Sequence, residues 1–159
     1  MSLLSRGIEN FLLKQHFVVV SSITSDWSIH CSAKGIGYIE DGYKIYLLDL
    51  YLGRTFRNLK QNPVISITAV DEHQFRGYVI KGRAHLIDRH NIPETILRAW
   101  DERVTQRISA RLIRNVQRER NTQHHPESQF PRPQYVIEMD AEEVIDLTPP
   151  DLKSSPGQK

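Results

Sequence analysis

The sequence has one cysteine, no long apolar run and little net charge. Cys31 is the only cysteine among 159 residues, so no internal disulfide can form, as expected of a protein in a reducing cytoplasm. No apolar stretch approaches the roughly 20 residues that a membrane-spanning helix needs. The first residues lack the basic, apolar and small-residue order of a secretory signal. These absences predict a cytoplasmic protein that does not span a membrane.

Charge is unevenly distributed along the chain. The formal net charge of +2 gives the whole molecule little attraction for polyanions. Arginines gather in residues 98–120, so a nucleic acid would have to bind there. Acidic residues interleave with these arginines, and Glu94 precedes Arg98 by one helical turn. We therefore expect a solvated helix that supports a dimer, and we do not expect nucleic acid as a partner.

Alternating hydrophobicity dominates most of the chain and predicts β-strands. The Asp41-Gly42 pair is a strong signal for a hairpin between two of them. Helical patterns are confined to residues 5–15, to a short stretch at 56–61 and to residues 93–120. The alternating stretches are residues 17–23, 27–33, 36–40, 44–50, 64–70, 76–87 and 135–147, the last with an interruption near Asp140-Ala141. Strands linked by hairpins, with little helix between them, predict a mainly β fold built on an antiparallel barrel.

The length fits one domain, which we place at residues 1–149, followed by a disordered tail at 150–159. Within it, the long helix before the last strand has one apolar stripe that faces a core or a partner. A polar connector at 121–133 follows this helix. The stripe consists of Ile96, Trp100, Val104, Ile108, Leu112 and Val116.

The turn Gly53-Arg54-Thr55 carries the clearest chemical signal. A strand ends there and a short helix begins, and the free N–H groups of a helix start favour an anion. Arginine adds a planar fork that matches phosphate oxygens, and threonine adds a hydroxyl donor. The turn therefore predicts a phosphate monoester site. The alternative is that Thr55 only caps the helix while Arg54 is solvated.

Several short motifs, taken in order, resemble the pyridoxamine 5'-phosphate oxidase-like FMN proteins. The resemblance covers residues 17–88, and residues 135–149 are similar to the last barrel strand of that family. It implies a split β-barrel that binds FMN. The motifs are Ser32-Ala33-Lys34, Asp41-Gly42, Gly53-Arg54-Thr55, Asn58-Leu59, Asn62-Pro63 and Lys81-Gly82-Arg83-Ala84.

The resemblance also assigns roles at both ends of the flavin. Arg54 and Thr55 would grip the phosphate from the turn at Gly53, and Lys34 would reach it from the adjacent strand. Without the resemblance, Lys34 is equally well a solvated lysine at a strand end. The flavin ring would lie between two subunits of a homodimer. The residues implied along the ring are Cys31, Ser32, Arg76 and Gly77.

The leading functional hypothesis is an FMN-dependent oxidoreductase acting on an unidentified small molecule. Flavin carries the hydride chemistry, so the sequence needs no obvious catalytic acid or base. The alternatives on the same barrel are a deazaflavin-dependent reductase and a haem-handling relative. A non-catalytic flavin-binding or nucleic-acid-binding module is the alternative from another class. No Trp follows Trp100 and no Arg follows Arg132, so we do not expect oxidation of pyridoxamine phosphate itself.

Two further candidates carry little chemistry. The spacing of His124-His125 is not a usual ligand pattern and no cysteine accompanies it, so we predict a polar loop and no metal site. Cys31 as a nucleophile would need a base and an orienting group that the sequence does not place. Packing or contact with flavin is the preferred role for this cysteine.

Overall fold

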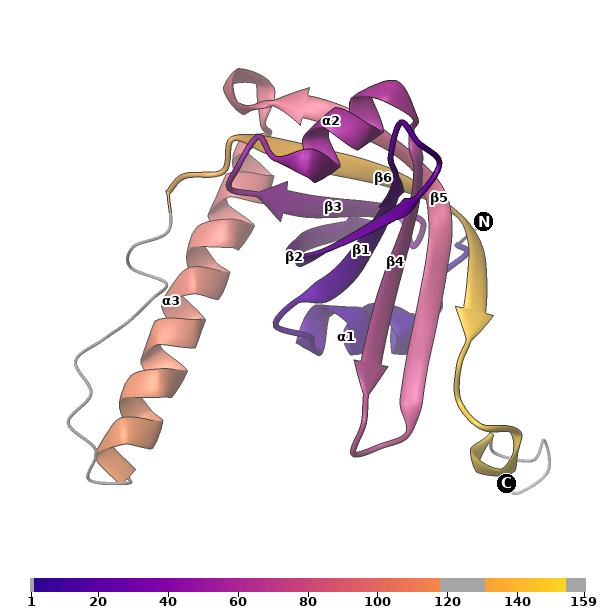
Figure 1. The fold of residues 1–159 in the computed structure, drawn as a ribbon. Helices are drawn as coiled ribbons and strands as arrows, with labels where there is room; N and C mark the ends of the chain where they lie inside the picture. The colour runs from indigo at the N-terminus through magenta and orange to yellow at the C-terminus, as the bar shows by residue number, and fades with distance from the viewer. Residues whose placement is uncertain (1, 118–130, 154–159) are drawn as a thin grey trace.

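Six antiparallel strands form a closed barrel (Figure 1). This computed structural model describes residues 2–117 and 131–153 of the chain. The strands are β1 (Val18–Ile23), β2 (Ile29–Glu40), β3 (Lys44–Asp49), β4 (Val64–Asp71), β5 (Arg76–Asp88) and β6 (Tyr135–Asp146). They pair in the order β1-β2-β3-β6-β5-β4, and β4 also pairs with β1 to close the ring. The predicted antiparallel barrel is confirmed.

The three predicted helices are present as α1 (Arg6–Lys14), α2 (Arg54–Gln61) and α3 (Glu94–Gln117). Helices α1 and α2 lie at opposite ends of the barrel, and α3 runs down one side (Figure 1). A short 3-10 turn, η1 (Arg89–Asn91), precedes α3. Within the described residues, no helix combines the length and apolar character needed to cross a membrane.

The end of the chain departs from the expected disordered tail at its first residues. Residues 150–152 form a 3-10 turn, η3 (Pro150–Leu152), in which the Leu152 N–H donates to the Pro149 carbonyl at 3.0 Å. The ammonium of Lys153 lies 3.7 Å from the Asp146 carboxylate, so this turn is tied to the end of β6. Residues 154–159 of the expected tail and residues 118–130 around the expected connector lie outside the described residues.

Strand β2 unites the two alternating stretches of the sequence into one long strand. Residues 29–34 of β2 pair with β1, and residues 35–40 pair with β3, with a register shift between Ile36 and Tyr38. The hairpin that follows has positive φ at both Asp41 (52°) and Gly42 (68°). This is the backbone that an Asp-Gly hairpin turn requires, so the hairpin prediction is confirmed.

The core fills the barrel interior with alternate residues from all six strands. Helix α1 closes one end of this core through Phe11 and Leu12, and the Phe11 ring packs edge-on against Tyr78 at 5.2 Å. Alternation therefore places the residues between these positions on the outside of the barrel. The most buried strand residues include Val20, Ile45, Leu47, Ile67, Ile80, Ile137 and Met139.

Helix α3 packs apolar side chains on the barrel along its first turns. Ile92 and Ile96 join Tyr46, Leu48 and Val136 in a second apolar cluster on the outer face of β3 and β6. Further along, α3 diverges from the barrel (Figure 1). Leu112, near the end of the predicted apolar stripe, is 47% exposed. The stripe is therefore buried at its start, and near its end no described residue covers Leu112.

Candidate functional site

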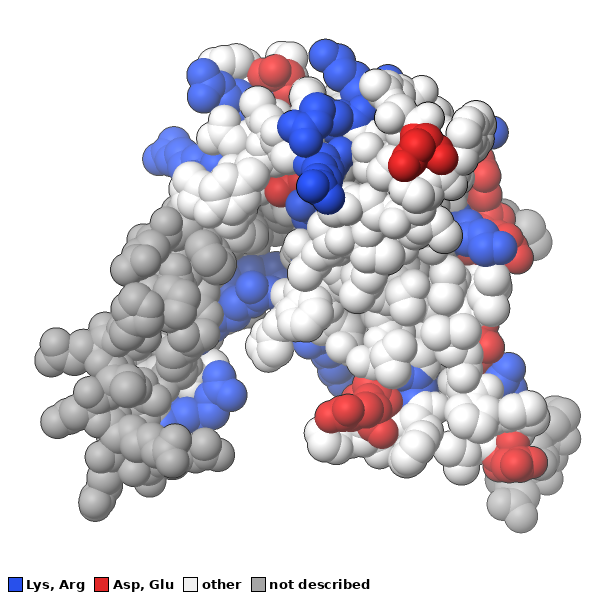
Figure 2. All heavy atoms as spheres, viewed as in Figure 1, with Lys and Arg blue, Asp and Glu red and all other residues white. Residues whose placement is uncertain are grey.

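The start of α2 is open toward solvent and positively charged. Gly53 caps the helix without a side-chain hydrogen bond, and a Cβ added to it would meet no atom within 4 Å. The first helical hydrogen bond is donated by Arg57 to the Gly53 carbonyl at 3.3 Å, so the N–H groups of residues 54–56 precede it. The side chain of Arg54 is exposed. Figure 2 shows Lys and Arg side chains gathered over α2, which carries Arg54, Arg57 and Lys60.

Two buried polar side chains fix α2 to the barrel beneath it. The hydroxyl of Thr55, a residue that is 2% exposed, lies 2.8 Å from the hydroxyl of Ser32 on β2. One turn later, the Asn58 amide donates to the buried hydroxyl of Ser22 on β1 at 3.0 Å. Thr55 does not cap the helix through its side chain, and it points inward. In the sequence, Asn58 is visible only as part of the Asn58-Leu59 motif, and nothing there marks Ser22 as its partner.

A buried ion pair lies next to this contact, at the same end of the barrel. The Lys34 ammonium is 2.6 Å from Oδ2 of Asp49, and the two side chains are 13% and 4% exposed. The hydroxyl of Tyr135 donates to the same carboxylate oxygen at 2.6 Å. Burial, followed by this hydrogen bond to Asp49, raises the pKa of Tyr135 above its usual range. Lys34 is thus neither solvated nor free, because it is paired with Asp49, which was not among the predicted site residues.

Cys31 lies on the opposite side of β2 from Ser32 and Lys34, because successive residues of a strand alternate. Its thiol is exposed on the outer face, 3.4 Å from the hydroxyl of Ser21 on β1. The barrel face below α2, which includes β1, β2 and β4, is nearly free of charged side chains (Figure 2). Its outward-facing residues include Val19, Ser21, Ile29, Cys31, Ala33, Val64, Ser66 and Val70.

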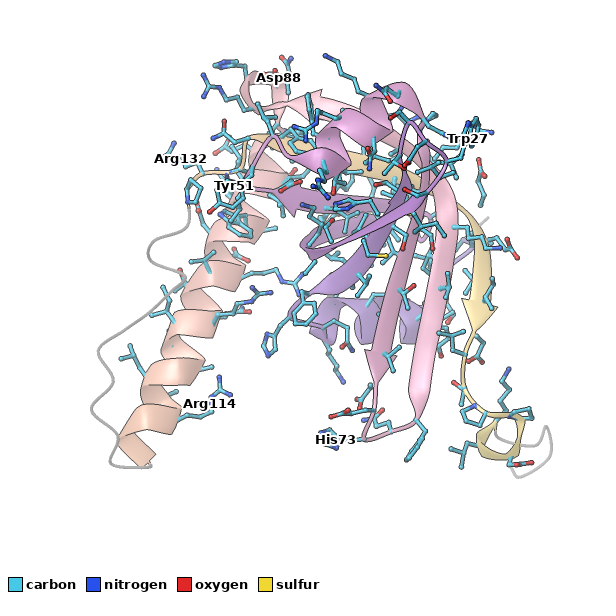
Figure 3. All side chains as sticks on the ribbon, viewed as in Figure 1. Trp27, Tyr51, His73, Asp88, Arg114 and Arg132 are labelled. Carbon is cyan, nitrogen blue, oxygen red and sulfur yellow. The ribbon has the colours of Figure 1, made fainter. Side chains whose placement is uncertain are left out.

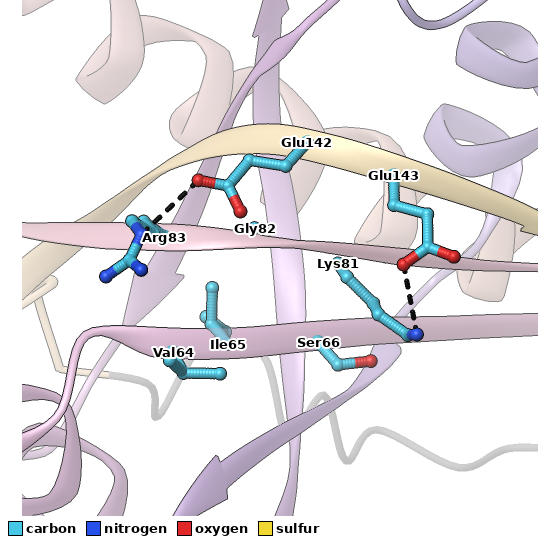
Figure 4. Close-up of a pocket in the computed structure, with 8 residues that line it drawn as sticks. All are labelled: Val64, Ile65, Ser66, Lys81, Gly82, Arg83, Glu142 and Glu143. Carbon is cyan, nitrogen blue, oxygen red and sulfur yellow. Dashed lines mark ion pairs between the residues drawn. The ribbon is translucent and has the colours of Figure 1, made fainter.

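This uncharged face ends at β5, where charged residues line a hollow of about 290 Å³ (Figure 4). The Lys81 ammonium lies 3.0 Å from the Glu143 carboxylate, and the Arg83 guanidinium lies 3.4 Å from that of Glu142. Gly82 is required between them, since a Cβ there would lie 2.0 Å from the Asp140 carbonyl oxygen. The register shift at this point corresponds to the predicted interruption near Asp140-Ala141.

The structure separates Arg76 and Gly77 from the α2 start within one chain. Both begin β5, next to the hairpin whose tip carries His73, at the end of the molecule opposite the loop that carries Tyr51 (Figure 3). The Arg76 guanidinium donates to the Tyr78 hydroxyl at 3.1 Å and lies 5.8 Å from the centre of the Phe11 ring. One chain therefore brings together Ser32, Lys34, Gly53, Arg54 and Thr55, while Cys31 lies on the outer face and Arg76 with Gly77 at the far end.

No group of three or more His, Cys, Asp or Glu side chains in the described residues is arranged to hold a metal ion. The pair His124-His125, predicted to lie in a polar loop, falls outside those residues. The groups available to a ligand at the start of α2 are therefore hydrogen-bond donors and cations. Such a donor set suits an anion.

Comparison with known proteins places the chain in one family and one fold. The family model described as pyridoxamine 5'-phosphate oxidase matches residues 4–147. No curated protein matches the chain. Among solved structures, HupZ from Group A Streptococcus aligns with a TM-score of 0.66 at 15% identity, covering 92% of this chain and 95% of HupZ.

Two other similar structures come from proteins whose names state a cofactor. An FMN-binding protein from Syntrophomonas wolfei aligns with a TM-score of 0.60 at 11% identity, covering 86% of this chain and 81% of that protein. An F420 reductase aligns with a TM-score of 0.56 at 13% identity, covering 89% of this chain and 98% of the reductase. At these identities the alignments show a shared fold.

Proposed function

The chain belongs to the pyridoxamine 5'-phosphate oxidase family, and from this premise we propose that it binds FMN and acts as a flavin-dependent oxidoreductase on a small molecule. The observation that carries the proposal is the open start of α2. There, a helix start without a side-chain cap, free space at Gly53 and the exposed guanidinium of Arg54 coincide. These groups fit a phosphate monoester, which is the charged end of FMN.

Each group at the start of α2 has a distinct part in holding FMN. Arg54 donates to the phosphate oxygens, and the backbone N–H groups of the first helical turn donate beside it. Thr55 and Asn58 keep the helix start in place through their hydrogen bonds to Ser32 and Ser22. When bound, FMN supplies the hydride-transfer chemistry, and the chain's residues bind it, orient it and exclude water.

We propose a homodimer in which a second copy covers the uncharged face of β1, β2 and β4. A face with exposed Val19, Ile29 and Val64 is costly to leave in water. Covering it would bury the flavin ring beside Cys31 and bring Arg76 and Gly77 of the second copy to a site that they do not reach within one chain. Light scattering of the FMN-loaded protein tests this, and a monomer at micromolar concentration contradicts it.

The Arg54→Ala variant tests the cofactor site. Loss of a charge-assisted phosphate contact is expected to weaken FMN binding by roughly 1.5–3 kcal/mol, while riboflavin, which lacks the phosphate, should bind as before. Flavin fluorescence quenching measures both affinities. Arg57→Ala is the matched control, because Arg57 is also an exposed arginine of α2 but lies one turn further from the helix start. An FMN affinity of Arg54→Ala within twofold of wild type would exclude Arg54 as the phosphate anchor.

A deazaflavin is the second candidate cofactor, because an F420 reductase is among the similar structures. The absorbance spectrum of the protein with bound cofactor separates the two, since flavins and deazaflavins absorb at different wavelengths. We do not propose pyridoxamine phosphate as the substrate. A second phosphorylated ligand would need its own cationic clamp to position its reacting carbon, and the sequence has no Arg after Arg132 to provide one.

A further inference from the structure

Lys34 is placed where it could contact a phosphate bound at the start of α2. It lies two residues after Ser32 on the same side of β2, about 6.5 Å along the strand. The Ser32 hydroxyl is in turn 2.8 Å from that of Thr55, the second residue of α2. A lysine side chain is a flexible four-carbon stem ending in a compact charge. With no competing partner, its ammonium could turn toward the start of α2.

The Lys34 ammonium already has a partner, and that partner is rigidly held. Asp49 pairs with Lys34 at 2.6 Å, accepts the Tyr135 hydroxyl at 2.6 Å on the same oxygen, and accepts the Tyr51 N–H at 3.3 Å on the other. Asp49 and Tyr135 are both buried. The carboxylate is therefore fixed from β6 and from the loop after β3, and it cannot swing away to release the lysine.

We propose that Asp49 is a specificity-determining residue that withholds Lys34 from the cofactor phosphate, so that Arg54 alone among the described side chains supplies positive charge to it. This inference rests on the proposed FMN site. The charges of Lys34 and Asp49 cancel at short range, which leaves one guanidinium and the helix start to face a doubly charged group. The site then prefers FMN to riboflavin less strongly than it would if both Arg54 and Lys34 contacted the phosphate.

The Asp49→Asn variant tests whether Asp49 keeps Lys34 away from the phosphate or has only a structural role. The amide oxygen still accepts the Tyr135 hydroxyl, while the charge that holds Lys34 is gone. We expect FMN to bind about tenfold tighter, as expected for one added charge-assisted contact, and riboflavin to stay within twofold of wild type. Fluorescence quenching gives both affinities. An unchanged ratio of the two affinities would overturn the proposal, because Lys34 would then have no path to the phosphate.

The Lys34→Met/Asp49→Asn double variant is the matched control and a second test. It removes both charges of the buried ion pair together, a change that often leaves the stability of a protein unaltered. Because Lys34 does not contact the phosphate in the wild type, we expect the double variant to keep the wild-type ratio of FMN to riboflavin affinity. A tenfold loss of that ratio would show that Lys34 is already a phosphate ligand, and the proposal would be wrong even if Asp49→Asn alone failed to fold.

Inorganic phosphate distinguishes failure of this inference from failure of the proposed function. If the wild type binds neither FMN nor riboflavin, the proposed function fails. In that case the rise in melting temperature with phosphate, relative to chloride at equal ionic strength, still tests Asp49. We expect a larger rise for Asp49→Asn than for the wild type, and a rise like that of the wild type for the double variant. Equal rises in all three proteins would overturn the inference.

Discussion

Helices α2 and α3 differ in how completely the chain itself anchors them. Helix α2 has only eight residues, yet Thr55, Asn58 and Leu59 are all buried against the barrel. Helix α3 has 24 residues, and among those whose side chains the structure describes, only Ile96 is fully buried. Helices in proteins owe most of their stability to a packed face. The shorter helix is therefore the more firmly placed of the two, which suits a segment that we propose presents Arg54 to a ligand.

The two helices also differ in the kind of contact that holds them. Side-chain hydroxyl and amide groups of α2 pair with Ser32 and Ser22. The middle of α3 is tied to the rest of the chain by arginines that donate to backbone carbonyls. Arg103 donates to the carbonyls of Ile36 and Leu13, and Arg107 donates to that of His16. Such contacts leave the part of α3 beyond its first turns able to separate from the barrel without exposing the apolar cluster around Ile96.

Matched leucine truncations give the largest expected contrast between the helices. Leu59→Ala on α2 removes a buried side chain of the main core, which should lower the free energy of unfolding by about 2–5 kcal/mol. Leu112→Ala on α3 removes an exposed side chain and should change it by less than about 0.5 kcal/mol in the monomer. Urea denaturation measures both. Equal losses at low protein concentration would mean that the two helices are equally anchored.

A smaller and more local effect is expected from Arg103→Met. Loss of the carbonyl contacts should let the part of α3 from Arg103 onward open more often, so its amides should exchange with solvent about tenfold faster, a change worth about 1.4 kcal/mol. Amides of β4 and β5 should keep their exchange rates. Arg98→Met is the control, since Arg98 on the same helix is exposed and pairs with Glu94 at 2.6 Å on the surface. Faster exchange throughout the barrel would show that α3 and the barrel unfold as one unit.

Local signals in the sequence predicted most of the fold. Asp41-Gly42, Gly53 and Asn62-Pro63 each mark a real turn or helix boundary, because glycine and proline act on the backbone where they stand. The apolar period of residues 93–120 predicted α3 and the burial of Ile96. That period could not show that the stripe is exposed near Leu112, because its burial depends on the direction in which the helix leaves the barrel.

The site was predicted less completely, because its contacts depend on strand register. Asp49 continues the inward positions of Ile45 and Leu47 along β3, so an acidic residue there signals a buried partner. That signal is visible in the sequence, but the identity of Lys34 as the partner requires knowing how β2 and β3 align. The inward orientation of Thr55 toward Ser32 could not be predicted for the same reason. The role of Arg54 at the phosphate, inferred from the turn alone, stays a prediction.

The place of β6 in the barrel sets the order in which the chain can fold. This last strand lies between β3 and β5, pairing with Asp49 through Tyr135 and with Tyr78 through Asp146. While the chain is being synthesised, β3 and β5 therefore each expose an unpaired edge until residue 146 has left the ribosome. Pairing so distant in sequence is slow, and open edges invite association between chains. Aggregation of nascent or truncated chains that end before β6 is the expected cost of this topology.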